Sequence, residues 1–203
     1  MSRHGDAAFG FAVWGNLLRA RLYAVKTAPY VNIYHGDAAS HGGIVQDTPY
    51  GFLNIIFDDD EVDGDPALIG VIIAVMDEKM DPVPYIVKAE VGAGGEAGYV
   101  MVADHPDQEF LIQEDCATTD AMDLVDAGQN CDIYSQTYHA GTAATGISLM
   151  ELDSSDVSAA VKQCKLHYPH LEDTVPGTEG TWHPRWVVTL NAHYYGDTIA
   201  GIT

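Results

Sequence analysis

The sequence predicts an all-β protein, an antiparallel β-barrel or sandwich with an extended or short-helical N-terminal arm. From residue 22 onward, short apolar and β-branched runs are divided by Gly, Pro, Asp and Asn, which is typical of strands and turns. Few helical patterns separate these runs, so antiparallel pairing is favoured over a parallel sheet. The clearest runs are residues 30–34, 50–57, 68–76, 85–91, 99–103, 109–113, 147–152, 163–168 and 186–194.

Two local patterns and the chain length add detail to this prediction. In the last run, Trp186, Val188 and Leu190 alternate with a mixed set of residues, so we expect a strand with one apolar face. A short helix is expected over residues 155–162, with Asp153 or Ser154 as its N-cap. The 203 residues fit a single domain, because all-β barrels and sandwiches reach this size without dividing.

The first 26 residues differ from the rest of the chain in charge and in pattern. They hold four basic residues against the single acid Asp6, a net charge of +3 that leaves −24 for residues 27–203. Apolar side chains between residues 9 and 18 recur at roughly helical spacing, which predicts a short helix or an ordered arm. We expect this arm to dock on an acidic surface, its own or a neighbour's, and a solvated terminus is the alternative. The contact candidates are Phe9, Phe11, Trp14, Arg19, Arg21 and Lys26.

The overall charge and the cysteines exclude several classes of partner. Nine Lys and Arg oppose thirty Asp and Glu, a net charge of −21 that argues against nucleic-acid binding, which needs rows of basic residues. No apolar run reaches the roughly 18 residues of a membrane span, so no membrane partner is expected. Cys116, Cys131 and Cys164 lack the C-x-x-C spacing of zinc or redox sites, and we interpret them as buried free thiols.

The acidic run at residues 58–65 is the closest match to a cation site. Asp59, Glu61 and Asp63 fit the first three ligand positions of a calcium loop, and Gly64 fits its turn. Position twelve is Gly70 where a bidentate Glu is required, so we interpret the run as a solvated hairpin tip, with adventitious cation binding as the alternative.

Histidines offer a second metal hypothesis, at His167, His170 and Glu172. Strand residues three apart point to opposite faces, so these two histidines share a metal only if Pro169 bends the chain. Exposed polar residues at a strand end are the favoured interpretation. We therefore expect neither a metal nor a cofactor.

No motif isolates a catalytic group. The glycines at positions 92, 94, 95 and 98 lack the third glycine of a dinucleotide loop, because Ala97 stands in its place. The run Gly146-Ile147-Ser148 does not continue to the final Gly of a nucleophile elbow. Carboxylates are so numerous that a proposed acid–base pair would carry no information. We expect a protein that is not an enzyme.

Four segments in the second half of the chain carry short motifs in a fixed order. Residues 98–113 (GYVMVADHPDQEFLIQ) contain "A-D-x-P-x-x-x-F-x-x-Q", and residues 124–130 (LVDAGQN) contain "D-x-G-x-N". Residues 145–148 (TGIS) with 151–154 (ELDS) follow "T-G-x-S-x-x-x-L-D", and residues 186–193 (WVVTLNAH) contain "V-x-x-N-x-H", followed by the short tail at 200–202. In this order the segments resemble a strand pair, a turn, a further segment and the closing strand of a class of β-rich virion proteins of tailed bacteriophages that includes head decoration (cement) proteins. The first 48 residues and the spacer at 171–184 are not matched.

The resemblance implies a decoration protein that binds and stabilises the shell of the major capsid protein by contact, with no catalytic residues. It implies a homotrimer on the capsid surface of the virion, assembled in the host cytoplasm. The charge and pattern described above divide the chain into residues 1–26 as the arm and 27–203 as a single β-rich decoration domain. Two alternatives remain: a phage tail, fibre or host-surface binding module, and a metal-dependent enzyme on a β scaffold.

Overall fold

The computed structural model describes residues 9–26, 32–44, 53–56, 68–86, 96–115, 122–134, 145–170 and 183–196. These residues form antiparallel sheets, and the all-β prediction is confirmed. The elements are β1 (Ala12–Val13), β2 (Ala20–Lys26), β3 (Ile33–Tyr34), β4 (Ala38–Ile44), β5 (Leu53–Ile56), β6 (Leu68–Met76), β7 (Tyr85–Ile86), β8 (Glu96–Ala103), β9 (Glu109–Gln113), the 3-10 turn η2 (Leu124–Asp126), β10 (Asn130–Cys131), β11 (Ile133–Tyr134), β12 (Glu151–Leu152), β13 (Cys164–Pro169) and β14 (Arg185–Leu190).

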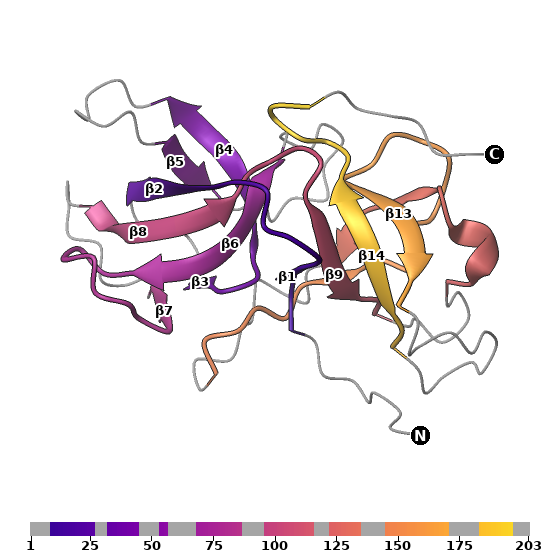
Figure 1. Cartoon of the computed structure of the whole chain (residues 1–203), viewed down its shortest axis with the longest axis horizontal. Helices are drawn as coiled ribbons and strands as arrows, with labels where there is room; N and C mark the ends of the chain where they lie inside the picture. Colours follow the sequence, from indigo (N-terminus) through magenta and orange to yellow (C-terminus); the bar gives the residue numbers. More distant parts are fainter. Residues whose placement is uncertain are drawn as a thin grey trace.

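Two five-stranded sheets lie side by side (Figure 1). The first has the order β1-β9-β14-β13-β10, and the second has the order β2-β8-β6-β4-β5. Two short pairs, β3 with β7 and β11 with β12, complete the described sheets. The edge strands β2 and β5 of the second sheet lie near each other, but no strand pairing among the described residues closes that sheet into a barrel.

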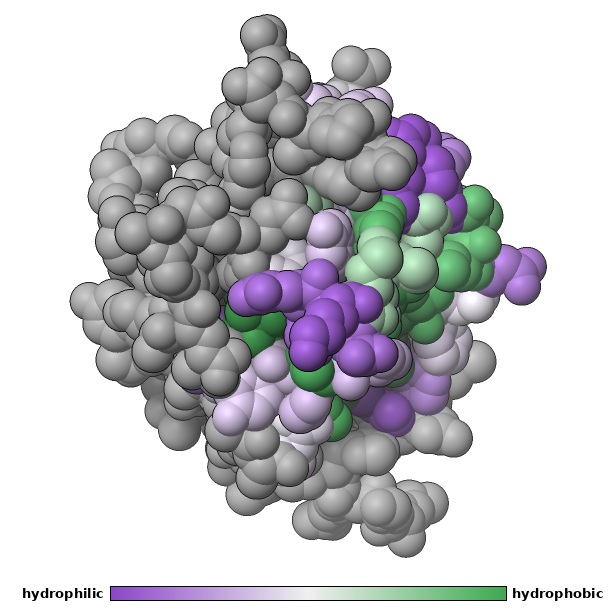
Figure 2. All heavy atoms as spheres, turned by 90° about the vertical axis from the view of Figure 1, so that its left-hand side faces the viewer, coloured by the Kyte–Doolittle hydropathy of each residue, from purple (hydrophilic) through white to green (hydrophobic). Residues whose placement is uncertain are grey.

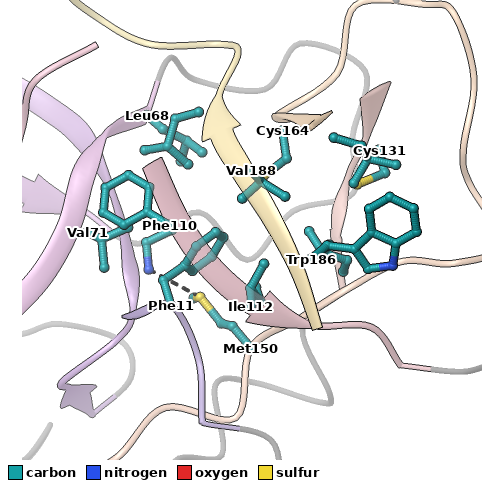
Figure 3. Packing of buried hydrophobic residues seen from close by; sticks show 14 of the residues in the cluster. Phe11, Leu68, Val71, Phe110, Ile112, Cys131, Met150, Cys164, Trp186 and Val188 are labelled. Atoms are coloured by element: carbon teal, nitrogen blue, oxygen red, sulfur yellow. Dashed lines mark hydrogen bonds between the residues drawn. The ribbon is translucent and has the colours of Figure 1, made fainter. Parts of the chain in front are cut away.

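A shared hydrophobic core joins the two sheets. Leu68 and Val71 of β6 pack in one cluster with Phe110 of β9 and Trp186 of β14. Figure 3 shows Leu68, Val71 and Phe110 between the two sheets, and Trp186 on the other side of β14 near Cys131. A second cluster fills the inner face of the second sheet, where β2 and β8 contribute alternate residues and β6, which has an irregular register, contributes every third one. Because one cluster draws on both sheets, the described strands form one body.

The strand β14 is buried more completely than its alternation predicts. Trp186 and Val188 point into the shared core, opposite Ile112 and Phe110 of β9. Val187, on the face expected to be mixed, is also buried. The strand lies between β9 and β13, and central strands are covered on both faces more often than edge strands.

Glycine is required in β6 where this strand lies beside the end of its partner β8. Gly70 has φ +156, and a Cβ placed there would lie 2.2 Å from the carbonyl oxygen of Ala103. A side chain at this position would push the two strands apart. The close approach lies next to the end of β8, where the chain leaves the second sheet.

The chain passes between the sheets at two places, and one side chain holds the two crossings together. Residues 14–19 lead from β1 to β2, and residues 104–108 lead from β8 to β9. The buried Gln108 accepts a hydrogen bond from the Leu18 amide at 2.8 Å, and its Nε2 donates to the Glu109 carbonyl at 3.0 Å. Weaker contacts from Nε2 reach the carbonyls of Trp14 and Asn16. The two crossings therefore form one fixed corner.

The prediction of a separate N-terminal arm is wrong for residues 9–26. Residues 12–13 pair with β9, and residues 20–26 pair with β8 over their whole length, so this segment belongs to both sheets. No helix forms between residues 9 and 26. Val13 packs against the shared core, whereas Leu17 and Leu18 are exposed, so the helically spaced apolar residues do not share one buried face. Residues 1–8 lie outside the described part of the chain.

The helix expected over residues 155–162 does not form. Asp153 binds the amide and the hydroxyl of Ser155, as an N-cap would, but the chain then turns away. The amide and carbonyl of Asn130 pair with Ser158, so the backbone of this segment is satisfied by tertiary partners in place of helical ones.

Candidate functional site

Asp104 lies at the corner where β8 ends. Its buried side chain contacts Arg19, which immediately precedes β2, and Arg21 and Tyr23 within β2. One carboxylate oxygen accepts from Arg19 Nε at 2.7 Å. The other accepts from the hydroxyl of Tyr23 at 2.5 Å and lies 3.3 Å from Arg21 Nε. Arg19 also donates to the backbone carbonyl of Asp104. Burial and the neighbouring carboxylate raise the pKa of Tyr23 above its usual range, so this hydroxyl is a hydrogen-bond donor.

Tyr195 forms the other side of this corner. The guanidinium carbons of Arg19 and Arg21 lie 5.5 and 5.4 Å from the centroid of its ring, within cation–π range. The Tyr195 amide donates to His193 Nδ1 at 3.0 Å, and the Tyr194 amide donates to the Leu68 carbonyl at 2.7 Å. The C-terminal end of the described chain is thereby fixed against β6.

The charges at the corner do not cancel. Arg19 and Arg21 are positive, and Asp104 is the one carboxylate that pairs with them in the described residues. Burial lowers the pKa of His193 to about 4, so this ring is neutral at pH 7. One positive charge therefore remains on two arginine side chains that are 32% and 47% exposed, in a chain with a net charge of −21.

Large apolar and aromatic side chains next to the two arginines are exposed. Leu17 and Leu18 are about half exposed just before Arg19, and Tyr194 and Tyr195 are more than two-fifths exposed. The two tyrosine rings meet edge to face at 5.1 Å. We call the set Leu17, Leu18, Arg19, Arg21, Tyr194 and Tyr195 the junction surface.

A second apolar surface lies on the outer face of the second sheet. Leu22, Met101 and Ala74 are neighbours in one row across β2, β8 and β6, and Met101 is exposed. Figure 2 views the end of the molecule that carries this sheet, where hydrophobic residues gather beside strongly hydrophilic ones. This face contains none of the arginines of the junction surface.

The structure separates the six predicted contact residues. Phe11 is 1% exposed and packs edge to face on Phe110, so it cannot reach a partner in this fold, and its prediction as a contact is corrected. Phe9 is half-buried, and Trp14 is half-buried against the ring of His170. Only Arg19 and Arg21 come together at one exposed place. Lys26 lies in β2 opposite Glu96, with its side chain outside the described set.

The histidines proposed as metal ligands have other partners. His167 Nε2 lies 3.0 Å from Thr189 Oγ1, and His170 Nδ1 lies 3.1 Å from a guanidinium nitrogen of Arg185. No group of three metal-ligating side chains occurs within the residues that the structure describes. Glu172 and the acidic run at 58–65 lie outside them.

Two buried carboxyl groups were not singled out by the sequence. Burial raises the pKa of Asp37 to about 7 and that of Glu114 to about 8. Asp37 accepts from the Tyr34 amide at 2.7 Å, and its other carboxyl oxygen is buried without a hydrogen-bond partner among the described residues. Glu114 accepts from Trp186 Nε1 at 3.0 Å. Among thirty acids, no local pattern distinguishes the few that the fold buries.

Two cysteines and one serine are enclosed by the fold. Cys131 and Cys164 are buried free thiols opposite each other on β10 and β13, as predicted, and burial raises the pKa of each. Cys116 lies outside the described residues. Ser148, from the run that resembles part of a nucleophile elbow, is also buried. A reagent in solution does not reach these groups in the native fold.

Comparison with known proteins gives no assignment. No protein-family description matches this chain, and no curated protein or solved structure matches it significantly. No helix among the described residues is long and apolar enough to cross a membrane.

Proposed function

We propose that this chain is a capsid decoration (cement) protein of a tailed bacteriophage, which binds the shell of the major capsid protein and stabilises it without catalysis. In this proposal the protein acts as a homotrimer on the capsid surface. Two lines of reasoning support it: the ordered sequence segments that resemble this class, and the junction surface.

The junction surface is the observation that carries the proposal. Tyr and Arg are the side chains most enriched at binding hot spots, because they bury a large area with few rotamers to restrain. Here Tyr195 and the two arginines are held by Asp104 and His193 before any partner arrives. A pre-organised surface loses less conformational entropy on binding than a flexible one.

The net charge suits the same role. A strongly acidic body is repelled by packaged DNA and remains soluble while many copies assemble. Contacts that exist only in the assembled particle stabilise that particle by mass action, and multiple attachment points raise the occupancy.

Binding to capsid shells tests the proposal. Purified protein is mixed with shells of the phage that encodes it, and the bound fraction is measured by co-sedimentation. We expect saturable binding, weakened about 30-fold or more by Tyr194→Ala if this ring is a hot spot. Met101→Gln, on the outer face of the second sheet, is the matched control and should bind as the unmodified protein does.

The location of the protein in the particle tests it independently. Particle imaging should show many copies on the head. A few copies at one vertex would indicate a tail protein, and absence from particles would refute the assignment. Deleting residues 1–21 is not a usable test of docking, because it removes β1 and the first residues of β2.

A further inference from the structure

The geometry points to the Arg19–Arg21 pair as a receptor for a carboxylate: we infer that the junction surface binds an Asp or Glu side chain of a partner protein. This inference rests on the proposed function, because it names the chemistry of the contact that a decoration protein would make. The claim concerns one subsite within the junction surface.

The first step is the stoichiometry of charge. Two guanidiniums share one carboxylate, whose oxygens are already occupied by Arg19 on one side and by Tyr23 and Arg21 on the other. Asp104 therefore has little capacity to neutralise the second arginine. In the part of the chain that the structure describes, no other carboxylate pairs with either guanidinium. A second carboxylate would convert a two-to-one cluster into a balanced two-to-two cluster.

The second step is orientation. Arg19 uses Nε and one terminal nitrogen on Asp104, and Arg21 approaches Asp104 through Nε. The terminal nitrogens of Arg21 have no acceptor among the described residues. Its side chain is 47% exposed, and the ring of Tyr195 supports its guanidinium. A guanidinium held in this way presents a planar pair of donors, which matches the two oxygens of a carboxylate.

The third step is the kind of anion. The arginines lie beside exposed Leu18, Tyr194 and Tyr195, which would bury apolar area only against another protein surface. A small inorganic anion would leave these side chains in water. The chain has thirty acids and nine bases, so most of the molecule repels an acidic partner. The incompletely neutralised arginine pair is a place where such a partner is attracted, and it therefore fixes where the partner binds.

A peptide titration tests the inference on the full chain. Isotope-labelled protein is titrated with acetyl-tetraglutamate amide while NMR follows the Nε–H signals of Arg19 and Arg21 and the amide of Tyr195. We expect saturable shifts confined to these signals and diminished by salt. Acetyl-tetraglutamine amide should cause no such shifts, and inorganic phosphate should bind more weakly than the glutamate peptide.

Charge-matched variants make the test specific. Arg21→Gln should weaken the glutamate peptide at least about tenfold, the scale of one charge-assisted contact. Lys79→Gln removes the same charge from the exposed turn between β6 and β7, and it should change the affinity less than about twofold. Equal effects of the two variants, equal binding of the glutamine peptide, or unchanged binding by Arg21→Gln would overturn the inference.

Two further observations keep the outcome interpretable. Arg21→Gln leaves Asp104 bound to Arg19 and Tyr23, so the melting temperature of this variant should stay close to that of the unmodified protein. Arg21→Lys keeps the positive charge but loses the planar pair of donors, so it should bind the glutamate peptide with intermediate affinity. Peptide binding without capsid binding would retain the carboxylate subsite and reject the decoration role. Capsid binding that Arg21→Gln leaves intact would do the reverse.

Discussion

Glu114 and Trp186 are joined by a 3.0 Å hydrogen bond inside the core, although the carboxyl group is wholly buried. The indole Nε1 donates to one carboxyl oxygen, and the other oxygen has no hydrogen-bond partner among the described residues. Burial is the largest influence on this group, and it raises the pKa of Glu114 to about 8. Its neutral form is therefore the one that the fold favours.

This pKa predicts that Glu114 makes the protein less stable as pH rises. Between the unfolded pKa, near 4.5, and the folded value of about 8, the folded state holds a proton that the unfolded state has lost. The free energy of unfolding then falls with pH, by at most about 1.4 kcal/mol per pH unit for this group, and levels off above pH 8.

Glu114→Gln tests this pH dependence, because the amide is neutral and can still accept from Trp186. Its stability relative to the unmodified protein, from urea unfolding, should grow from pH 5 to pH 8. Asp107→Asn removes the same charge from a side chain that is 88% exposed, and it should show no comparable trend. A stability difference that is constant across this range would refute the proposed protonation.

Asp104→Asn should destabilise the fold, because it leaves two guanidiniums close together without their carboxylate. Breaking a fully buried ion pair costs about 3–5 kcal/mol, and we expect about 2–4 here because both arginines are partly exposed. Urea unfolding at constant pH measures the loss. Pairing Asp104→Asn with Arg21→Gln should recover part of it, and strictly additive losses would show that the two charges do not interact.

Gly70→Ala should be far more disruptive than Gly15→Ala. Both positions have a positive φ, but a Cβ at Gly70 would meet the Ala103 carbonyl, whereas one at Gly15 has open space within 4 Å. We expect a loss of about 1 kcal/mol from backbone strain at Gly15 and several kcal/mol at Gly70. Thermal unfolding of the two variants provides the comparison. Similar melting temperatures would mean that β6 and β8 separate readily.

Cys131 and Cys164 should react with a thiol reagent only when the protein opens. Both are buried, and burial raises the pKa of each thiol, so the reactive thiolate is scarce as well as inaccessible. In a Cys116→Ser background, labelling under native conditions should be slow, and it should become rapid in denaturant. Immediate native labelling of either thiol would contradict the described packing of β10 against β13.

Local pattern was sufficient to predict several strands and insufficient for others. β6 and β9 have the predicted bounds, because continuous or alternating apolar residues act over a few neighbours. The strand β4 (Ala38–Ile44) was missed, since its small and polar residues have little strand preference. It forms because β5 and β6 pair with it on either side. The strand β2 was missed because its basic residues, Arg21 and Lys26, were assigned to a basic N-terminal arm.

The sequence by itself determined the all-β class and the acidic character, and it placed Arg19 and Arg21 among the contact candidates, since composition, periodicity and charge are properties of short stretches. Only the tertiary structure decided that Asp104, 85 positions from Arg19, is the carboxylate that pairs with Arg19 and Arg21. It also decided that both guanidiniums lie over the ring of Tyr195. Pairing across such distances depends on how β2, β8 and the end of β14 meet in space. No local pattern contains that information, because one carboxylate among thirty differs from the others only in what surrounds it.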